Sequence, residues 1–211
     1  IRDGRVTGVQ TCALPILGTD EYSTSTQEDV ERFRAYVDDL IKYINSKGKR
    51  PHLWGGLKAY DGETPISNEA TMDYWAASQS GDPQLGLELG FDIVNILDTY
   101  LYIVPRAGYY RDYLDIKWLY NNWEPTVWSS SVTIPLDPGL KGAKFALWND
   151  RSVSLGVTMH DSHDRLFPAV QVVSEKTWHG ARNDRTYEDF ASCAEKVGEA
   201  PTINISHKLE V

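Results

Sequence analysis

Two adjacent acidic residues, Asp20 and Glu21, follow a short apolar segment and precede a helix start signal. Two carboxyl groups close together can divide the work of catalysis, one as a general acid and the other as a nucleophile or base. Barrel enzymes with parallel strands place such groups where the strands end. In a chain with 30 acidic residues, an Asp-Glu pair also arises by chance. For the dipeptide alone, an exposed turn before the helix therefore stays open as the alternative.

Aromatic side chains provide a second chemical signal, with 7 Trp and 12 Tyr in 211 residues. The apolar faces of sugar rings stack on aromatic rings and exclude water, so this content favours carbohydrate binding. Aromatic residues also fill protein cores, and for any single Trp this alternative has equal weight.

Charge and hydropathy narrow the classes of partner. A net charge of -9 disfavours nucleic acid and anionic membranes, because both require a basic surface. No apolar stretch approaches membrane-spanning length, and no signal pattern is present at the N-terminus. The five His residues have no metal-ligand spacing, with His160 and His163 expected in a polar loop. We expect no metal and no cofactor.

Residues 6–16 match the in-frame translation of a common sequencing adapter. We therefore interpret residues 1–16 as non-native and residues 17–211 as the folded part of a truncated gene. Cys12 then falls outside the native chain, which leaves Cys193 without an internal disulfide partner. We expect Cys193 to be a small buried residue in a helix.

The elements that must position the acids alternate between short strands and amphipathic helices. Ser25 and Glu28 resemble a capping box, and the helix after them carries apolar residues at helical spacing up to Gly48. Thr186 and Asp189 resemble a second capping box. The predicted strands cover residues 50–57, 71–77, 92–104 and 142–148, and the predicted later helices cover residues 166–178 and 186–197. This alternation predicts an α/β fold with parallel strands.

Five segments resemble, in chain order, motifs of the catalytic barrel of glycoside hydrolase family 20. They are residues 17–22 with the acid pair, 52–56, 73–75, 100–102 and 142–150. Residues 164–168 and 175–178 are similar to the helix that follows strand 8 in these enzymes. The resemblance implies a partial (β/α)8 barrel, from the end of strand 4 to strand 8, because a whole barrel typically needs some 250 residues.

The resemblance also implies a substrate-assisted mechanism, an exception to the usual pair of enzyme carboxylates. Glu21 would protonate the leaving oxygen and later activate water, and Asp20 would orient the 2-acetamido group. Tyr102 would donate a hydrogen bond to the acetamido oxygen as that oxygen attacks C1. The sugar and its acetamido group would be walled by Trp54, Trp75 and Trp148, and sugar hydroxyls would be held by Asp150, where family members often have Glu.

Structural alternatives stay open for these positions. Trp54 and Trp75 are alternatively barrel core, Tyr102 a strand surface residue, and Asp150 the cap of the following turn.

The function implied by the resemblance is hydrolysis, with retention, of terminal β-linked N-acetylglucosamine or N-acetylgalactosamine, or of a short oligosaccharide, from a glycan. The segments at residues 101–105 and 198–201 look most like those of secreted or surface enzymes of Gram-positive bacteria, a group that includes lacto-N-biosidases. A second hypothesis is an inactive half-barrel that binds sugar or self-associates through its exposed strand edges.

Overall fold

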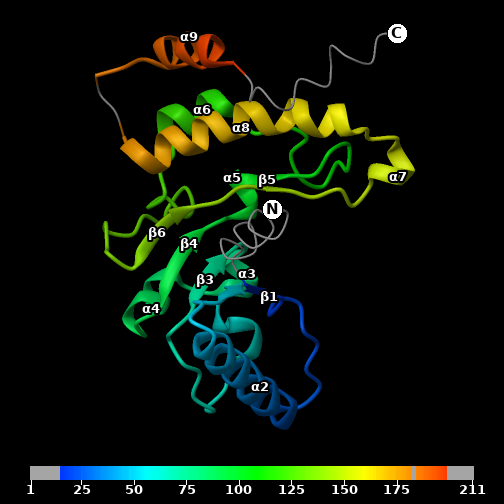
Figure 1. Cartoon of the computed structure of the whole chain (residues 1–211), viewed down its shortest axis with the longest axis vertical. Helices are drawn as coiled ribbons and strands as arrows, with labels where there is room; N and C mark the ends of the chain where they lie inside the picture. The colour runs from blue at the N-terminus through cyan, green and yellow to red at the C-terminus, as the bar shows by residue number, and fades with distance from the viewer. Residues whose placement is uncertain (1–14, 182–183, 199–211) are drawn as a thin grey trace, which may run out of the picture. The chain divides into compact units, whose positions relative to one another are not determined.

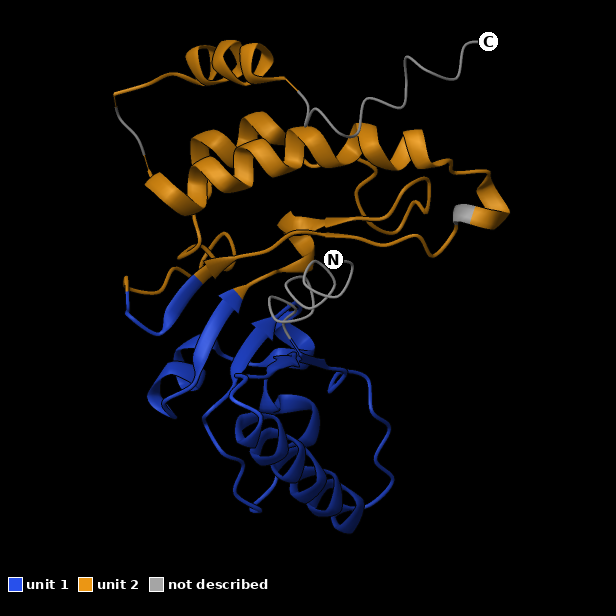
Figure 2. Cartoon of the chain, in the orientation of Figure 1, with its two compact units in different colours: residues 1–94, 137–141 blue, residues 95–136, 142–211 orange. Residues whose placement is uncertain are grey.

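The computed structural model describes residues 15–181 and 184–198 (Figure 1). The chain divides into two compact units (Figure 2): unit 1 comprises residues 1–94 and 137–141, and unit 2 comprises residues 95–136 and 142–211. Cys12 and the rest of residues 1–14 of the expected non-native segment lie outside the described residues.

Parallel strands with helices between them form the framework of unit 1. The sheet order is β1-β2-β3-β4-β6, and β1 pairs with β2, and β2 with β3, in parallel. These strands are β1 (Ile16–Leu17), β2 (His52–Trp54), β3 (Thr71–Tyr74), β4 (Asp92–Asn95) and β6 (Leu140–Ala143). The last residue of β4 and the last two residues of β6 are assigned to unit 2. The connecting helices are α2 (Gln27–Ser46), η1 (Leu57–Tyr60), α3 (Ala77–Ser80) and α4 (Pro83–Glu88). The predicted α/β class with parallel strands is confirmed.

Helix α2 covers unit 1 with the apolar stripe that its sequence predicts, and Val30, Phe33, Val37 and Ile41 are buried. Its predicted cap is wrong by one residue. The N-cap is Thr26, which has extended backbone angles, and its hydroxyl and Asp29 form the capping box in place of Ser25 and Glu28.

The buried Arg34 of α2 was not foreseen. Its guanidinium donates hydrogen bonds to the carbonyl oxygens of Tyr60 and Thr64, at 3.0 and 2.6 Å. These bonds satisfy the buried charge and tie α2 to the segment after β2.

The long predicted strand at residues 92–104 is interrupted. β4 ends at Asn95, a short helix α5 (Asp98–Leu101) follows, and the chain then enters β5 (Tyr102–Ile103). The amide of Asn95 explains the break, because its oxygen accepts a hydrogen bond from the Leu97 N–H at 3.1 Å and so turns the chain out of the strand. Its nitrogen donates to the carbonyl oxygens of Pro125 and Val127.

The predicted strand at residues 142–148 is likewise divided. The chain leaves β6 at Ala143, and the Lys144 N–H donates to the Asn95 carbonyl at 3.0 Å. It then forms β7 (Ala146–Leu147), which pairs in parallel with β5 in a separate two-stranded sheet.

Helices dominate the remainder of unit 2. They are α6 (Ile116–Asn122), α7 (Ser152–Leu155), α8 (Met159–His179) and α9 (Tyr187–Val197). The core of unit 2 lies among them, with Trp123 and Leu119 fully enclosed beside Val172 of α8 and Phe190 of α9. Among the described residues, no helix has both the length and the apolar character that crossing a bilayer requires.

The predictions for α8 and α9 have mixed outcomes. The capping box of Thr186 and Asp189 is confirmed, but α8 starts earlier than residue 166 because Thr158 and Asp161 form a capping box of their own. His160 and His163 therefore lie in a helix, contrary to the predicted loop.

Cys193 is exposed, so the prediction that it is buried is wrong. The stripe of α9 that packs on the core consists of Tyr187, Phe190 and Ala194, and Cys193 lies beside this stripe.

Candidate active site

Four of the seven predicted site residues lie at or just beyond the carboxyl ends of parallel strands in unit 1. Asp20 and Glu21 follow β1, Trp54 is the last residue of β2, and Trp75 follows β3 directly. Because the strands are parallel and in register, their carboxyl ends share one edge of the sheet. This is the edge at which barrel enzymes place their chemistry.

The segment carrying the acid pair is fixed on both sides. The buried Thr19 hydroxyl donates to the Trp54 carbonyl oxygen at 3.2 Å, across 35 residues of sequence. On the other side, the Tyr22 ring stacks on Phe33 of α2 with a centroid distance of 4.0 Å. These two contacts hold the two acids between the end of β2 and helix α2.

Glu21 has a left-handed backbone conformation, with φ of 52°. For a residue with a β-carbon this conformation costs roughly 1–2 kcal/mol, and it is maintained only where the surrounding contacts enforce it. Glu21 is exposed, whereas Asp20 is half-buried. The two carboxylates therefore sit in different surroundings although they are adjacent in sequence.

Trp75 is packed tightly against the backbone that follows Trp54. A β-carbon added at Gly55 would lie 3.4 Å from the Trp75 indole nitrogen, and Gly55 itself has φ of 105°. The main-chain N–H of Trp75 donates to the Ser80 hydroxyl oxygen at 3.3 Å. Trp75 is 8% exposed and Trp54 is half-buried, so the structure gives the two indoles different access to solvent.

The segment after Trp54 packs closely against α3 because Gly56 has no side chain. A β-carbon added at Gly56 would lie 1.9 Å from the Ser80 carbonyl oxygen, and only a residue without a β-carbon fits there. The sequence motif of Trp54, Gly55 and Gly56 thus has a steric reason.

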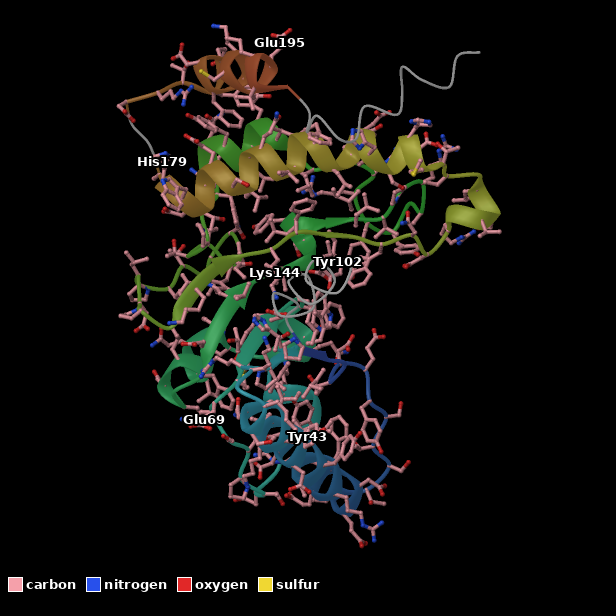
Figure 3. The ribbon with its side chains drawn as sticks, in the orientation of Figure 1. Tyr43, Glu69, Tyr102, Lys144, His179 and Glu195 are labelled. Atoms are coloured by element: carbon pink, nitrogen blue, oxygen red, sulfur yellow. The ribbon has the colours of Figure 1, made fainter. Side chains whose placement is uncertain are left out.

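The other three predicted residues lie in unit 2, where aromatic contacts organise them. Tyr102, labelled in Figure 3, is 4% exposed, so the alternative of a strand surface position is wrong. Its ring makes edge contacts with Trp148 at 5.6 Å and with Tyr110 at 5.4 Å. The main-chain N–H of Trp148 donates to the Ile103 carbonyl oxygen at 2.9 Å, which ties the end of β7 to β5.

Two tyrosine–aspartate hydrogen bonds flank these rings, and the sequence analysis missed both. The Tyr109 hydroxyl donates to the Asp150 carboxylate at 3.1 Å, and the Tyr110 hydroxyl donates to Asp98 at 2.9 Å. Partial desolvation and the bond to Asp150 raise the pKa of Tyr109. The aromatic density of residues 109–113 was a signal for such contacts, but it did not indicate the acidic partners.

A buried acid–base pair in unit 1 was also missed. His52 Nδ1 lies 2.9 Å from Asp73 Oδ1, with Asp73 wholly inaccessible to solvent. Each of the two residues stands two positions before a predicted site tryptophan, which is the sequence signal that could have identified them. Within the described ranges, no three His, Cys, Asp or Glu side chains are grouped so that they could hold a metal ion.

Comparison with known proteins confirms the resemblance and the fold class. The chain is 24% identical to the lacto-N-biosidase of Bifidobacterium bifidum over 212 aligned positions, covering 90% of this chain and 18% of that protein. No family model matches the sequence.

Several solved structures have a fold similar to that of this chain, and they include a family 20 catalytic module. Dispersin B matches with a TM-score of 0.64 and 18% identity, over 83% of this chain and 58% of Dispersin B. A family 20 catalytic module of the pneumococcal exo-β-D-N-acetylglucosaminidase StrH matches with a TM-score of 0.62 and 16% identity, over 92% of this chain and 50% of that structure. The fold is similar to part of the barrel of these enzymes, and the chain spans about half of these structures and under a fifth of the curated relative.

Proposed function

We propose that this chain carries the carboxyl-terminal part of the active site of a retaining β-N-acetylhexosaminidase. The observation that carries the proposal is the acid pair at the end of β1, with Glu21 in a left-handed conformation and Thr19 bonded to the Trp54 carbonyl. Strain enforced by contacts at a strand end is typical of a functional site. The similarity to a lacto-N-biosidase and to the module of an exo-β-D-N-acetylglucosaminidase supports the same chemistry.

In the proposed first step, the Glu21 carboxylic acid gives its proton to the glycosidic oxygen while the substrate's own acetamido oxygen attacks C1. The bond from C1 to the leaving oxygen breaks, and a cyclic oxazolinium ion forms. Asp20 accepts a hydrogen bond from the acetamido N–H and balances the positive charge of this ion. Its half-buried position strengthens that interaction relative to water.

In the proposed second step, the Glu21 carboxylate takes a proton from water, and the water oxygen attacks C1 and opens the ring. Two inversions at C1 give net retention. The proposal assigns Tyr102 to the acetamido oxygen, which a hydrogen bond from the Tyr102 hydroxyl would hold in line for attack on C1, and Asp150 to sugar hydroxyls. Trp54, Trp75 and Trp148 hold the ring and the acetamido group in the reactive geometry.

The proposed substrate is a glycan that ends in β-linked N-acetylglucosamine or N-acetylgalactosamine, or in a short oligosaccharide that begins with one of them. The sequence resemblance to secreted and surface enzymes of Gram-positive bacteria supports a location outside the cell. We also propose that residues 1–16 are a non-native segment.

The test is release of p-nitrophenol from p-nitrophenyl N-acetyl-β-D-glucosaminide by the 211-residue chain. We expect Glu21→Gln to lower the rate by about 10²- to 10⁴-fold, the usual contribution of a general acid. Glu28→Gln is the matched control, because Glu28 is an exposed glutamate on α2 in the same unit, paired with Arg32. p-Nitrophenyl β-D-glucoside, which lacks the acetamido group, should not be cleaved. Release that is absent, or that does not depend on Glu21, would contradict the proposal.

A second candidate is a half-barrel without activity that binds sugar or self-associates. It is favoured by the position of β1 at one end of the sheet order among the described residues, because an end strand can pair with a strand of another chain. Sedimentation at several protein concentrations tests it, and a monomer that releases p-nitrophenol through Glu21 would exclude it.

A further inference from the structure

His52 and Asp73 form a buried acid–base pair that the proposed mechanism does not use. His52 Nδ1 and Asp73 Oδ1 are 2.9 Å apart, with side chains 11% and 0% exposed. A carboxylate oxygen accepts hydrogen bonds, so the His52 tautomer with its proton on Nδ1 is the donor in this pair. The bond joins adjacent strands, β2 and β3, across 21 residues of sequence.

The register of the strands places this pair beside the two tryptophans. Trp54 is the register partner of Asp73, so their side chains lie on the same face of the sheet. Side chains two positions apart in a strand share a face, so His52 lies on the same face as Trp54. Trp75 stands two positions after Asp73, directly beyond the end of β3. The opposite face carries the apolar side chains of Leu53 and Met72, both fully buried.

Packing alone does not explain a polar pair at this position. Burial of a carboxylate costs free energy even when it is paired, and apolar residues of similar volume often stabilise a core more. What the pair provides is geometry: the side-chain bond and the Gly55 N–H to Asp73 carbonyl bond of 2.8 Å both fix the end of β2 against β3. These are the strand ends that carry Trp54 and Trp75.

We propose that His52 and Asp73 are positioning residues that set the spacing of Trp54 and Trp75 and so limit the size of the N-acyl group that the site accepts. The inference rests on the proposed function, in which these indoles wall the acetamido group. A fixed wall spacing favours attack by the acetamido oxygen and disfavours a longer acyl chain.

The test compares Asp73→Asn with wild type on two substrates, the p-nitrophenyl β-glucosaminides with N-acetyl and N-propionyl groups. We expect Asp73→Asn to lower kcat for the N-acetyl substrate roughly ten- to a hundredfold and to reduce the preference for N-acetyl over N-propionyl. Asp92→Asn is the matched control. Asp92 begins β4 in the same unit and makes ion pairs with Arg50 and Lys141, both at 3.2 Å. The control should keep the wild-type kcat and preference.

Variants of His52 separate positioning from loss of fold. His52→Asn places an amide donor near the position of Nδ1 and should retain most of the activity and preference, whereas His52→Ala should lose both. Far-UV and near-UV circular dichroism report folding and the tryptophan environment in each variant. If Asp73→Asn fails to fold, the comparison of His52→Asn with His52→Ala tests the positioning role by itself.

The outcomes distinguish the two proposals. Glu21-dependent release together with an unchanged N-acyl preference in folded Asp73→Asn and His52→Ala overturns the positioning role and leaves the proposed function intact. Absence of Glu21-dependent release from the wild-type chain overturns the proposed function, and the positioning role falls with it.

Discussion

Unit 1 holds Trp54 and Trp75 at the ends of adjacent parallel strands, whereas unit 2 holds Tyr102 and Trp148 through ring contacts and short strands of two residues each. In unit 1 the acid pair, the glycines and the tryptophans are fixed by main-chain atoms, such as the Trp54 and Ser80 carbonyl oxygens. In unit 2 the Asp150 carboxylate receives its hydrogen bond from a tyrosine hydroxyl on a loop.

This difference has a physical consequence. Main-chain atoms at strand ends cannot move without disturbing the sheet, so a small steric change in unit 1 should have a large effect. Exposed side chains relax more easily, so removal of one hydroxyl in unit 2 should have a graded effect. The following substitutions test the contrast.

The largest effect is expected for Gly56→Ala. The added β-carbon would lie 1.9 Å from the Ser80 carbonyl oxygen, a main-chain atom that cannot rotate away. We expect a loss of about 3 kcal/mol in the free energy of unfolding, measured by urea denaturation. Hydrogen exchange should show the loss of protection in β2 and α3. Gly18→Ala is the control, because a β-carbon there meets nothing within 4 Å. Equal stability of the two variants would refute the rigid contact.

A smaller effect is expected for Tyr109→Phe, which removes only the hydroxyl that donates to Asp150. Asp150 then loses one fixed partner, and we expect KM for the N-acetylglucosaminide to rise roughly two- to fivefold with kcat little changed. Tyr43→Phe, an exposed tyrosine of α2 labelled in Figure 3, is the control. A fall in kcat as large as that expected for Asp73→Asn would show that unit 2 is no more tolerant than unit 1.

The smallest effect is expected for Glu31→Gln, and it depends on pH. Hydrogen bonds from the Thr64 side chain, the Glu63 N–H, Gln27 and the Thr64 N–H lower the pKa of Glu31 from 4.5 to about 2. A lowered pKa stabilises the folded state above the unfolded pKa, and this contribution is lost as pH falls from 4.5 towards 2.

Melting temperatures of wild type and Glu31→Gln should therefore differ at pH 6 and converge near pH 2. Asp39→Asn, an exposed carboxylate on the same helix, provides the comparison. A difference that grows on acidification would contradict the assigned hydrogen bonds.

Local sequence patterns predicted an element well where the spacing of its own apolar residues determines which face is buried. The apolar spacing of Val30, Phe33, Val37 and Ile41 predicted the buried face of α2. The predictions failed where a distant partner intervened. The run at residues 92–104 has the composition of one strand, yet the Asn95 amide ends it by bonding to Leu97 and to carbonyls some 30 residues away.

The sequence alone determined the α/β class, the capping box of α9 and the order of motifs that resembles family 20, because each depends on residue types at short, fixed spacing. Only the tertiary structure decided the left-handed Glu21, the bond from Thr19 to the Trp54 carbonyl and the pairing of His52 with Asp73. These features arise between residues 21 or 35 positions apart or from contacts that enforce strain. Local periodicity does not predict contacts between residues so far apart in sequence, because these contacts depend on the register of neighbouring strands.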